Sequence, residues 1–139
     1  MSGVTIVPVC AAALAILFVA LSVRTLRLRR ALGVPIGDGG DASMLRAMRV
    51  HANFAEYVPL SLLLLFFAQA GGAPAWLVHA LCACLLLGRA AHALGVSQAP
   101  ENYRYRVLGM GLTFTVLLTA SGYLAFAPAL ALLENAPAG

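Results

Sequence analysis

The sequence has no lysine and few charged residues of any kind. All nine basic residues are arginine, five residues are acidic, and 10% of the chain is charged, against about 25% in soluble domains. A water-soluble fold of 139 residues, 62% of them hydrophobic, has too little interior to bury its apolar side chains. We therefore predict one integral membrane domain, residues 1–139. The arginines border apolar runs and form no continuous basic surface, so a nucleic-acid partner is not expected.

Cysteine is also scarce, and its spacing does not suit a metal site. Cys10, Cys82 and Cys84 all lie in apolar runs, and the last two point in different directions on a helix. We expect them to pack as small apolar residues, without a metal and without a disulfide. The N-terminus has neither a basic segment before its first apolar run nor a convincing cleavage site. That run is expected to remain as a helix and not to be removed as a signal peptide.

Four apolar runs are separated by short segments rich in glycine, proline or polar residues. Each run is long enough to cover the roughly 20 residues that cross a bilayer. The predicted helices are residues 4–31, 43–70, 75–94 and 102–133. Asp41 or Ser43 is expected to cap the second helix, and the segment from Gly95 is expected to end the third. Gly109 and Gly111 would let a neighbouring helix approach the fourth closely.

The arginines predict how the helices are oriented in the membrane. All nine lie in or beside the loops that follow the first and third helices. The positive-inside rule places these loops in the cytoplasm and both termini in the periplasm. Three polar clusters then meet at the cytoplasmic end: the start of the second helix, Arg89, and the start of the fourth helix. Four arginines are expected to act as anionic-lipid anchors and topology signals: Arg24, Arg27, Arg29 and Arg30.

The second helix begins with a polar stripe that is unusual for a membrane helix. Residues three or four apart share a helix face, and Arg46, Arg49, Asn53 and Glu56 have this spacing, with Tyr57 beside them. Charges at membrane depth are costly, so the stripe must face protein, a ligand or a water-filled cavity. Two interpretations stay open, because the stripe could bind a ligand or form a buried network satisfied within itself. Arg46 could equally bind a lipid headgroup.

These side chains suit a polar, anionic ligand. Arginine binds carboxylates through a bidentate fork, Glu56 can accept from an ammonium group, and Asn53 can both donate and accept. Glutathione carries two carboxylates, one ammonium group and several amides, so it matches this set. An arginine or tyrosine near its thiol would favour the thiolate, which is the nucleophile. A lipophilic electrophile would reach such a site from the bilayer.

Residues 49–59, with the sequence RVHANFAEYVP, resemble a signature of the MAPEG family, the membrane-associated proteins in eicosanoid and glutathione metabolism. The signature has arginine, asparagine four residues later, glutamate three further on, often tyrosine, and then proline. The pair Gly88–Arg89 is similar to the bacterial branch of the family, as is Arg106 followed by Gly109, Met110 and Thr113. The resemblance covers essentially the whole chain.

The resemblance implies a homotrimer of four-helix bundles that binds glutathione between subunits near the cytoplasmic side. Arg106 would match the family's thiolate-stabilising arginine and act as the catalytic residue. His92 falls where glutathione-using eukaryotic members have a tyrosine, and Arg27 or Arg30 would match a helix-one arginine. The residues expected to bind glutathione are Arg49, Asn53, Glu56 and Tyr57, with further contacts from Arg46, Arg89, Tyr103 and Tyr105.

The predicted function is a membrane-bound glutathione transferase or glutathione-dependent peroxidase of a bacterial inner membrane, with glutathione as co-substrate and no metal. Its partners would be its own copies, membrane lipids and a small lipophilic substrate. Family membership alone does not establish catalysis. One alternative is a non-enzymatic, lipid-binding membrane scaffold of the same family. Another is a small proton-coupled exporter that uses Glu56, although a nearby Arg49 would keep that carboxylate ionised.

Overall fold

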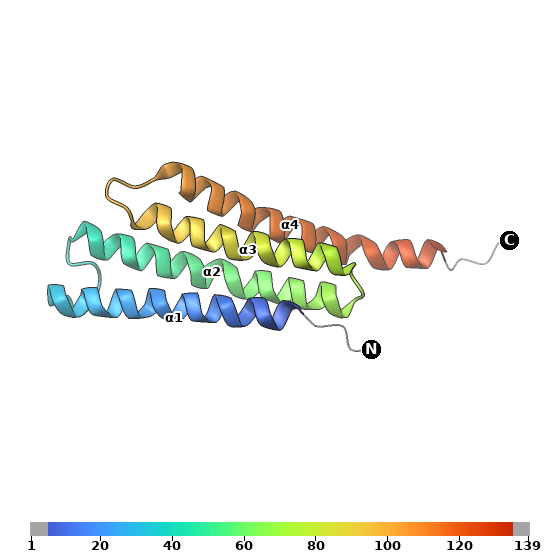
Figure 1. The fold of residues 1–139 in the computed structure, drawn as a ribbon, viewed down its shortest axis with the longest axis horizontal. Coiled ribbons are helices and arrows are strands. Elements are labelled where there is room, and N and C mark those ends of the chain that lie inside the picture. The colour runs from blue at the N-terminus through green and yellow to red at the C-terminus, as the bar shows by residue number, and fades with distance from the viewer. Residues whose placement is uncertain (1–5, 135–139) are drawn as a thin grey trace.

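Four long helices form the part of the chain that the structure describes. The computed structural model describes the backbone of residues 6–134 and the side chains of residues 6–127. The helices are α1 (Ile6–Leu32), α2 (Ala42–Ala70), α3 (Ala75–Ser97) and α4 (Tyr103–Glu134). They lie side by side in chain order with alternating direction (Figure 1), and all four contain a stretch long and apolar enough to span a membrane. The fold is the all-α membrane four-helix bundle expected from the apolar runs.

The largest difference from the predicted helix bounds is at the end of α3. Residues 4 and 5, expected to open the first helix, lie outside the described residues. Helix α3 continues to Ser97, beyond the expected end at residue 94. Gly95 does not break the helix, because it packs against the start of α4. A β-carbon on Gly95 would lie 2.7 Å from the backbone nitrogen of Arg106, so a larger residue would separate the two helices.

The loop between α1 and α2 is held by one arginine and one aspartate. Arg29 donates a hydrogen bond of 3.1 Å to the carbonyl oxygen of Val34, so it fixes the loop as well as contributing positive charge. Asp41 caps α2, as expected, by accepting from the backbone nitrogens of Ser43 and Met44 at 2.8 and 2.9 Å. These bonds, and above all one from the Ser43 hydroxyl, hold the pKa of Asp41 below its usual value.

Glycines allow α3 and α4 to pack backbone to backbone. A β-carbon on Gly109 would lie 2.5 Å from the carbonyl oxygen of Gly88 and 2.6 Å from the backbone nitrogen of His92. The expected close approach at Gly109 is therefore confirmed. Gly111 differs, because a β-carbon there would meet nothing within 4 Å in this chain. The close α3–α4 contact brings residues near the start of α4 toward the second half of α3.

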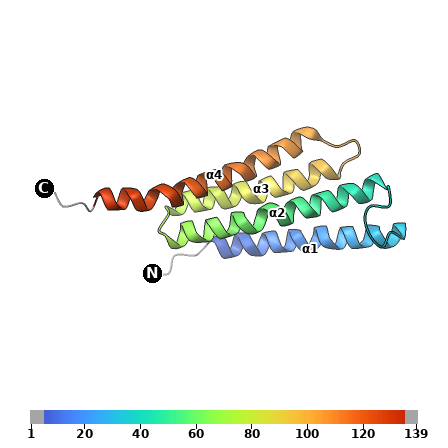
Figure 2. The ribbon, with the colours of Figure 1, turned by 180° about the vertical axis from the view of Figure 1, so that it is seen from behind.

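Apolar side chains fill the bundle and also cover much of its outside. The most deeply buried apolar residues include Leu14, Met44, Leu65, Leu85 and Val116. Large apolar residues also point outward, among them Ile16, Trp76 and Leu118. An outer surface of this kind suits lipid or a neighbouring protein, and would be costly in water. Figure 2 shows the α1–α2 and α3–α4 loops at the same end of the bundle, which places the polar segments beside one another.

Candidate functional site

A buried arginine joins three helices beneath the polar end of the bundle. The Arg89 side chain on α3 is 1% exposed. Its Nη1 donates to Oδ1 of Asn53 on α2 at 2.7 Å, and its Nη2 donates to the carbonyl oxygen of Gly109 on α4 at 3.2 Å. Its guanidinium carbon lies 5.9 Å from the centre of the Tyr57 ring. Because a buried charge requires such partners, Arg89 fixes the position of Asn53 relative to α3 and α4.

A polar cleft of about 190 Å³ opens next to Asn53. It lies between α2, the second half of α3, the α3–α4 loop and the first turns of α4. Its lining residues are Leu45, Arg46, Arg49, Asn53, His92, Val96, Glu101 and Arg106. Four of the residues predicted to form the site therefore lie together: Arg46, Arg49, Asn53 and Arg106. With three guanidinium groups, the cleft can attract and bind anions.

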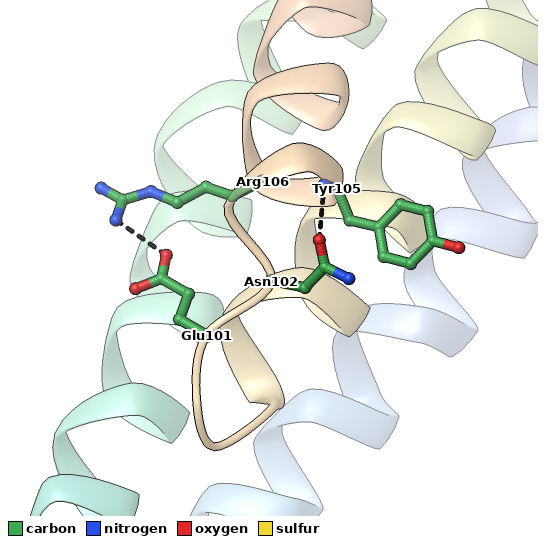
Figure 3. A network of polar contacts seen from close by, with 4 residues as sticks. All are labelled: Glu101, Asn102, Tyr105 and Arg106. Atoms are coloured by element: carbon green, nitrogen blue, oxygen red, sulfur yellow. Dashed lines mark hydrogen bonds and ion pairs between the residues drawn. The ribbon is translucent and has the colours of Figure 1, made fainter.

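Arg106 forms an ion pair with Glu101 at one wall of the cleft. Nη1 of Arg106 lies 2.8 Å from Oε1 of Glu101, and the two side chains are 49% and 34% exposed. Figure 3 shows both side chains extending to the same side of the loop, while Tyr105 extends to the opposite side. Asn102, between Glu101 and α4, accepts a 3.4 Å hydrogen bond through its Oδ1 from the backbone nitrogen of Tyr105. The start of α4 therefore directs Arg106, and not Tyr105, toward the cleft.

Two polar residues of the cleft were not among the predicted site residues. His92 is 6% exposed, and its backbone packs against Gly109. Its position three residues after Arg89 places both on one face of α3, a signal that the sequence contains. Glu101 lies in the α3–α4 loop, where helical spacing gives no signal. Only the folding of this loop back toward α2 brings its carboxylate to the cleft.

Other predicted site residues lie outside the lining of the cleft. Glu56 is exposed on α2, and Tyr57 is partly buried with its ring 5.7 Å from that of Phe114. Tyr103 and Tyr105 are 69% and 47% exposed. Arg89 is behind the cleft, where it contacts Asn53. Within a single chain, none of these five residues lines the cleft: two are buried or partly buried, and three are exposed elsewhere on the surface.

The proposed network among Arg49, Asn53 and Glu56 differs from what the structure contains. Within the described residues no ion pair joins Arg49 to Glu56, and both side chains are exposed. The side-chain oxygen of Asn53 is instead occupied by Arg89. The polar stripe is therefore not satisfied within itself, which leaves Arg49 and Glu56 available to another molecule or another copy of the chain.

A separate, apolar groove of about 300 Å³ runs between α1 and α2. Phe18 and Phe54 line it, and their rings lie 5.6 Å apart. Beside it, Ser22 and Nε2 of His51 form a hydrogen bond of 2.9 Å, and the His51 ring stacks on Phe18. His51 is thus occupied by its contacts with Ser22 and Phe18 of α1.

The sequence is similar to a known family of membrane proteins. The model of the MAPEG family matches residues 7–126. Inner membrane protein YecN of Escherichia coli strain K12 is 36% identical over 104 residues, which cover 75% of this chain and 78% of that protein. The protein of the same name from Escherichia coli O6:H1 strain CFT073 matches with the same identity and coverage. The range matched by the family model contains every residue that lines the cleft.

Proposed function

The chain belongs to the MAPEG family, and on that basis we propose that it is a membrane-bound glutathione transferase or glutathione-dependent peroxidase acting on lipophilic electrophiles. Membership in a family of eicosanoid and glutathione metabolism supports a glutathione-related or lipid-related role at a membrane. The similar Escherichia coli proteins are named as inner membrane proteins, which supports a bacterial inner membrane as the location.

The proposal depends chiefly on the three guanidinium groups that line one cleft: Arg46, Arg49 and Arg106. Positive charges gathered in one small space repel one another, and an anion among them relieves that repulsion. Glutathione supplies two carboxylates and, when ionised, a thiolate. A ligand of this charge is therefore a better match for the cleft than a neutral or cationic one.

The cleft is too small to enclose a tripeptide by itself. At about 190 Å³ it lies below the roughly 300–1,000 Å³ typical of ligand pockets. This difference supports a homotrimer in which a neighbouring copy closes the site. In that arrangement Arg27 or Arg30 of a neighbouring α1 would reach the ligand, and Glu56 and Tyr57, which lie outside the cleft of one chain, would face the same molecule.

Each polar residue of α2 has a proposed role in binding. Arg49 and Arg46 bind glutathione carboxylates through their guanidinium forks. Asn53, held by Arg89, orients the peptide backbone of the ligand, and Glu56 accepts from its ammonium group. The ligand contacts of Tyr57, Tyr103 and Tyr105 are peripheral. Because Arg89 is buried and donates to Asn53, it acts as a positioning residue and does not itself touch glutathione.

Arg106 is the proposed catalytic residue. Its positive charge favours the thiolate, so the thiol proton passes to solvent and the sulfur becomes nucleophilic. In conjugation the sulfur then forms a bond to an electrophilic carbon while the leaving group departs with its bonding electrons. In hydroperoxide reduction, two glutathione molecules are oxidised to one disulfide as the hydroperoxide becomes an alcohol and water.

The proposed topology places the cleft at the cytoplasmic end. The two loops that the arginines border lie at the end of the bundle where the cleft opens, and α1 begins at the other end (Figure 2). With the arginines in the cytoplasm, both termini lie in the periplasm. The site then faces the compartment in which thiols are kept reduced.

Calorimetry with glutathione and the detergent-purified protein tests the binding step. The parent is expected to bind, and Arg49→Ala and Glu56→Ala are expected to abolish binding without changing the oligomer on gel filtration. Arg104→Ala is the matched control, because Arg104 is exposed and does not line the cleft. A folded parent that does not bind glutathione would overturn the proposal.

A lipid-binding scaffold is the second candidate, and the apolar groove between α1 and α2 favours it. Such a protein would bind a fluorescent fatty acid saturably and would show no thiol chemistry. Ala15 lines the groove and is exposed, so Ala15→Trp would fill the groove and reduce binding. Ala12→Trp is the control, because Ala12 is exposed outside the groove. Equal binding by both variants would exclude the groove as a lipid site.

A further inference from the structure

The guanidinium group assigned to the thiolate already has a carboxylate partner. Arg106 lies 2.8 Å from Glu101, and both residues line the cleft. We propose that Glu101 is a specificity-determining residue that occupies the anion position on Arg106 until an anionic ligand displaces it. This inference rests on the proposed function for the identity of the ligand, but the competition between Glu101 and an anion can be measured without glutathione.

Asn102, the residue after Glu101, is bonded to both helices that flank the α3–α4 loop. The backbone nitrogen of Asn102 donates to the carbonyl oxygen of Gly95 at 2.9 Å, and that of Arg106 donates to the carbonyl oxygen of Asn102 at 3.2 Å. The residue next to Glu101 is therefore attached to the end of α3 and to the first turn of α4. Glu101 is brought to Arg106 by this loop and not by neighbouring positions on one helix (Figure 3).

The exposure of the pair indicates that a ligand can break it. The two side chains are 49% and 34% exposed, so water screens their attraction. Half-exposed pairs of this kind change an equilibrium by no more than about fivefold. A charged ligand that also contacts Arg46 and Arg49 can exceed that factor. A neutral molecule gains nothing from Arg106 and cannot displace Glu101.

The consequence is selection by charge at the position of the reacting group. An anion replaces the carboxylate and keeps Arg106 neutralised throughout. A neutral thiol would have to leave the Glu101–Arg106 pair intact and would lie away from the guanidinium group. Glu101 thus keeps neutral ligands away from the guanidinium group of Arg106, and it weakens the binding of all anions by the same modest factor.

Chemical modification of Arg106 tests this competition directly. Phenylglyoxal reacts with free guanidinium groups, and peptide mass spectrometry gives the rate at Arg106 alone. In Glu101→Gln we expect faster modification of Arg106. We also expect the sulfate concentration that gives half-protection to fall by about threefold to fivefold relative to the parent. Glu101→Asp keeps the charge but shortens the side chain and so weakens its contact with Arg106. The modification rate and the sulfate concentration for half-protection should therefore shift in the same direction as in Glu101→Gln. An unchanged modification rate, or unchanged protection by sulfate, would overturn the proposal.

Two controls separate the effect of the Glu101–Arg106 pair from an effect of net charge and from glutathione binding. Asp38→Asn removes one partly buried carboxylate from the loop at the same end of the bundle and should leave sulfate protection at Arg106 unchanged. An equal shift in Asp38→Asn would mean that net charge, and not the pair, is responsible, which contradicts the proposal. Calorimetry with glutathione on the same samples tests the proposed function independently. If glutathione fails to bind the parent, that function falls, and the sulfate result still decides the role of Glu101.

Discussion

Arg89 on α3 donates a hydrogen bond of 2.7 Å to Asn53 on α2, and Arg89 is almost wholly buried. Among the described residues, this is the only hydrogen bond between a charged side chain and an amide side chain that links α2 to α3. This bond determines which way Asn53 faces and therefore where the floor of the cleft lies. Nε of Arg89 has no hydrogen-bond partner among the described residues, so the cation depends strongly on the acceptors that it has. The geometry of the candidate site is thus coupled to the stability of the bundle.

Removing Asn53 should destabilise the protein more than removing Arg89. Asn53→Leu leaves a buried cation without a main acceptor, which costs about 3–5 kcal/mol. Arg89→Met removes the charge itself and leaves neutral acceptors unsatisfied, at about 1–3 kcal/mol. Unfolding in mixed detergent, followed by circular dichroism, gives the order. Glu56→Gln, an exposed change, is the control, and the reverse order would show that Asn53 is not the partner on which Arg89 depends.

Two glycines on α4 should respond oppositely to the same substitution. Gly109→Ala places a β-carbon 2.5 Å from a backbone oxygen of α3, and overpacking of this kind costs about 1–3 kcal/mol. Gly111→Ala meets nothing within 4 Å in this chain, so the gain in helix propensity should raise stability by about 0.5–1 kcal/mol. Thermal unfolding in detergent measures both. Equal effects would mean that the close contact between α3 and α4 is absent in solution.

The N-cap of α2 should weaken in acid. Because the native pKa of Asp41 is lowered, the folded protein binds this proton less readily than the unfolded chain does. The contribution of ionised Asp41 to the stability of the folded state is present above the unfolded pKa of about 3.9. It is lost as the pH falls through the lower native pKa. The protection factors of the amides in the first turn of α2, measured relative to the intrinsic exchange rate at each pH, should therefore fall at acid pH in the parent. Asp41→Asn caps without titrating, so an equally steep acid response in that variant would contradict this account.

Arg106→Ala should lower turnover much more than it lowers glutathione affinity. Loss of one group that stabilises developing or bound negative charge typically reduces kcat by about 10²–10³. Arg104→Ala, two residues away and outside the cleft, should retain parental turnover. Turnover with a chromogenic electrophile and calorimetry on the same preparations separate the two effects. Parental turnover in Arg106→Ala would remove this residue from the mechanism.

The helices and the polar stripe could be predicted because they depend on local composition. Four uncharged or weakly charged runs of membrane-spanning length specify four helices, and Asp41 has the side chain that a helix start requires. The spacing from Arg46 to Asn53 places both on one helix face, and both line the cleft. Gly95 was wrongly expected to end α3, because propensity alone cannot register that α4 packs against it.

Contacts between distant segments were decided by the tertiary structure alone. The sequence by itself determined the membrane setting, the number of helices and the gathering of arginines at one end, since hydrophobicity and charge act residue by residue. It did not determine that Asn53 faces Arg89, that Glu56 lies outside the cleft, or that Glu101 pairs with Arg106. Those relationships depend on the rotation of each helix and the path of the α3–α4 loop. Close packing at glycines joins α3 to α4, and that packing involves segments that are separate in the sequence.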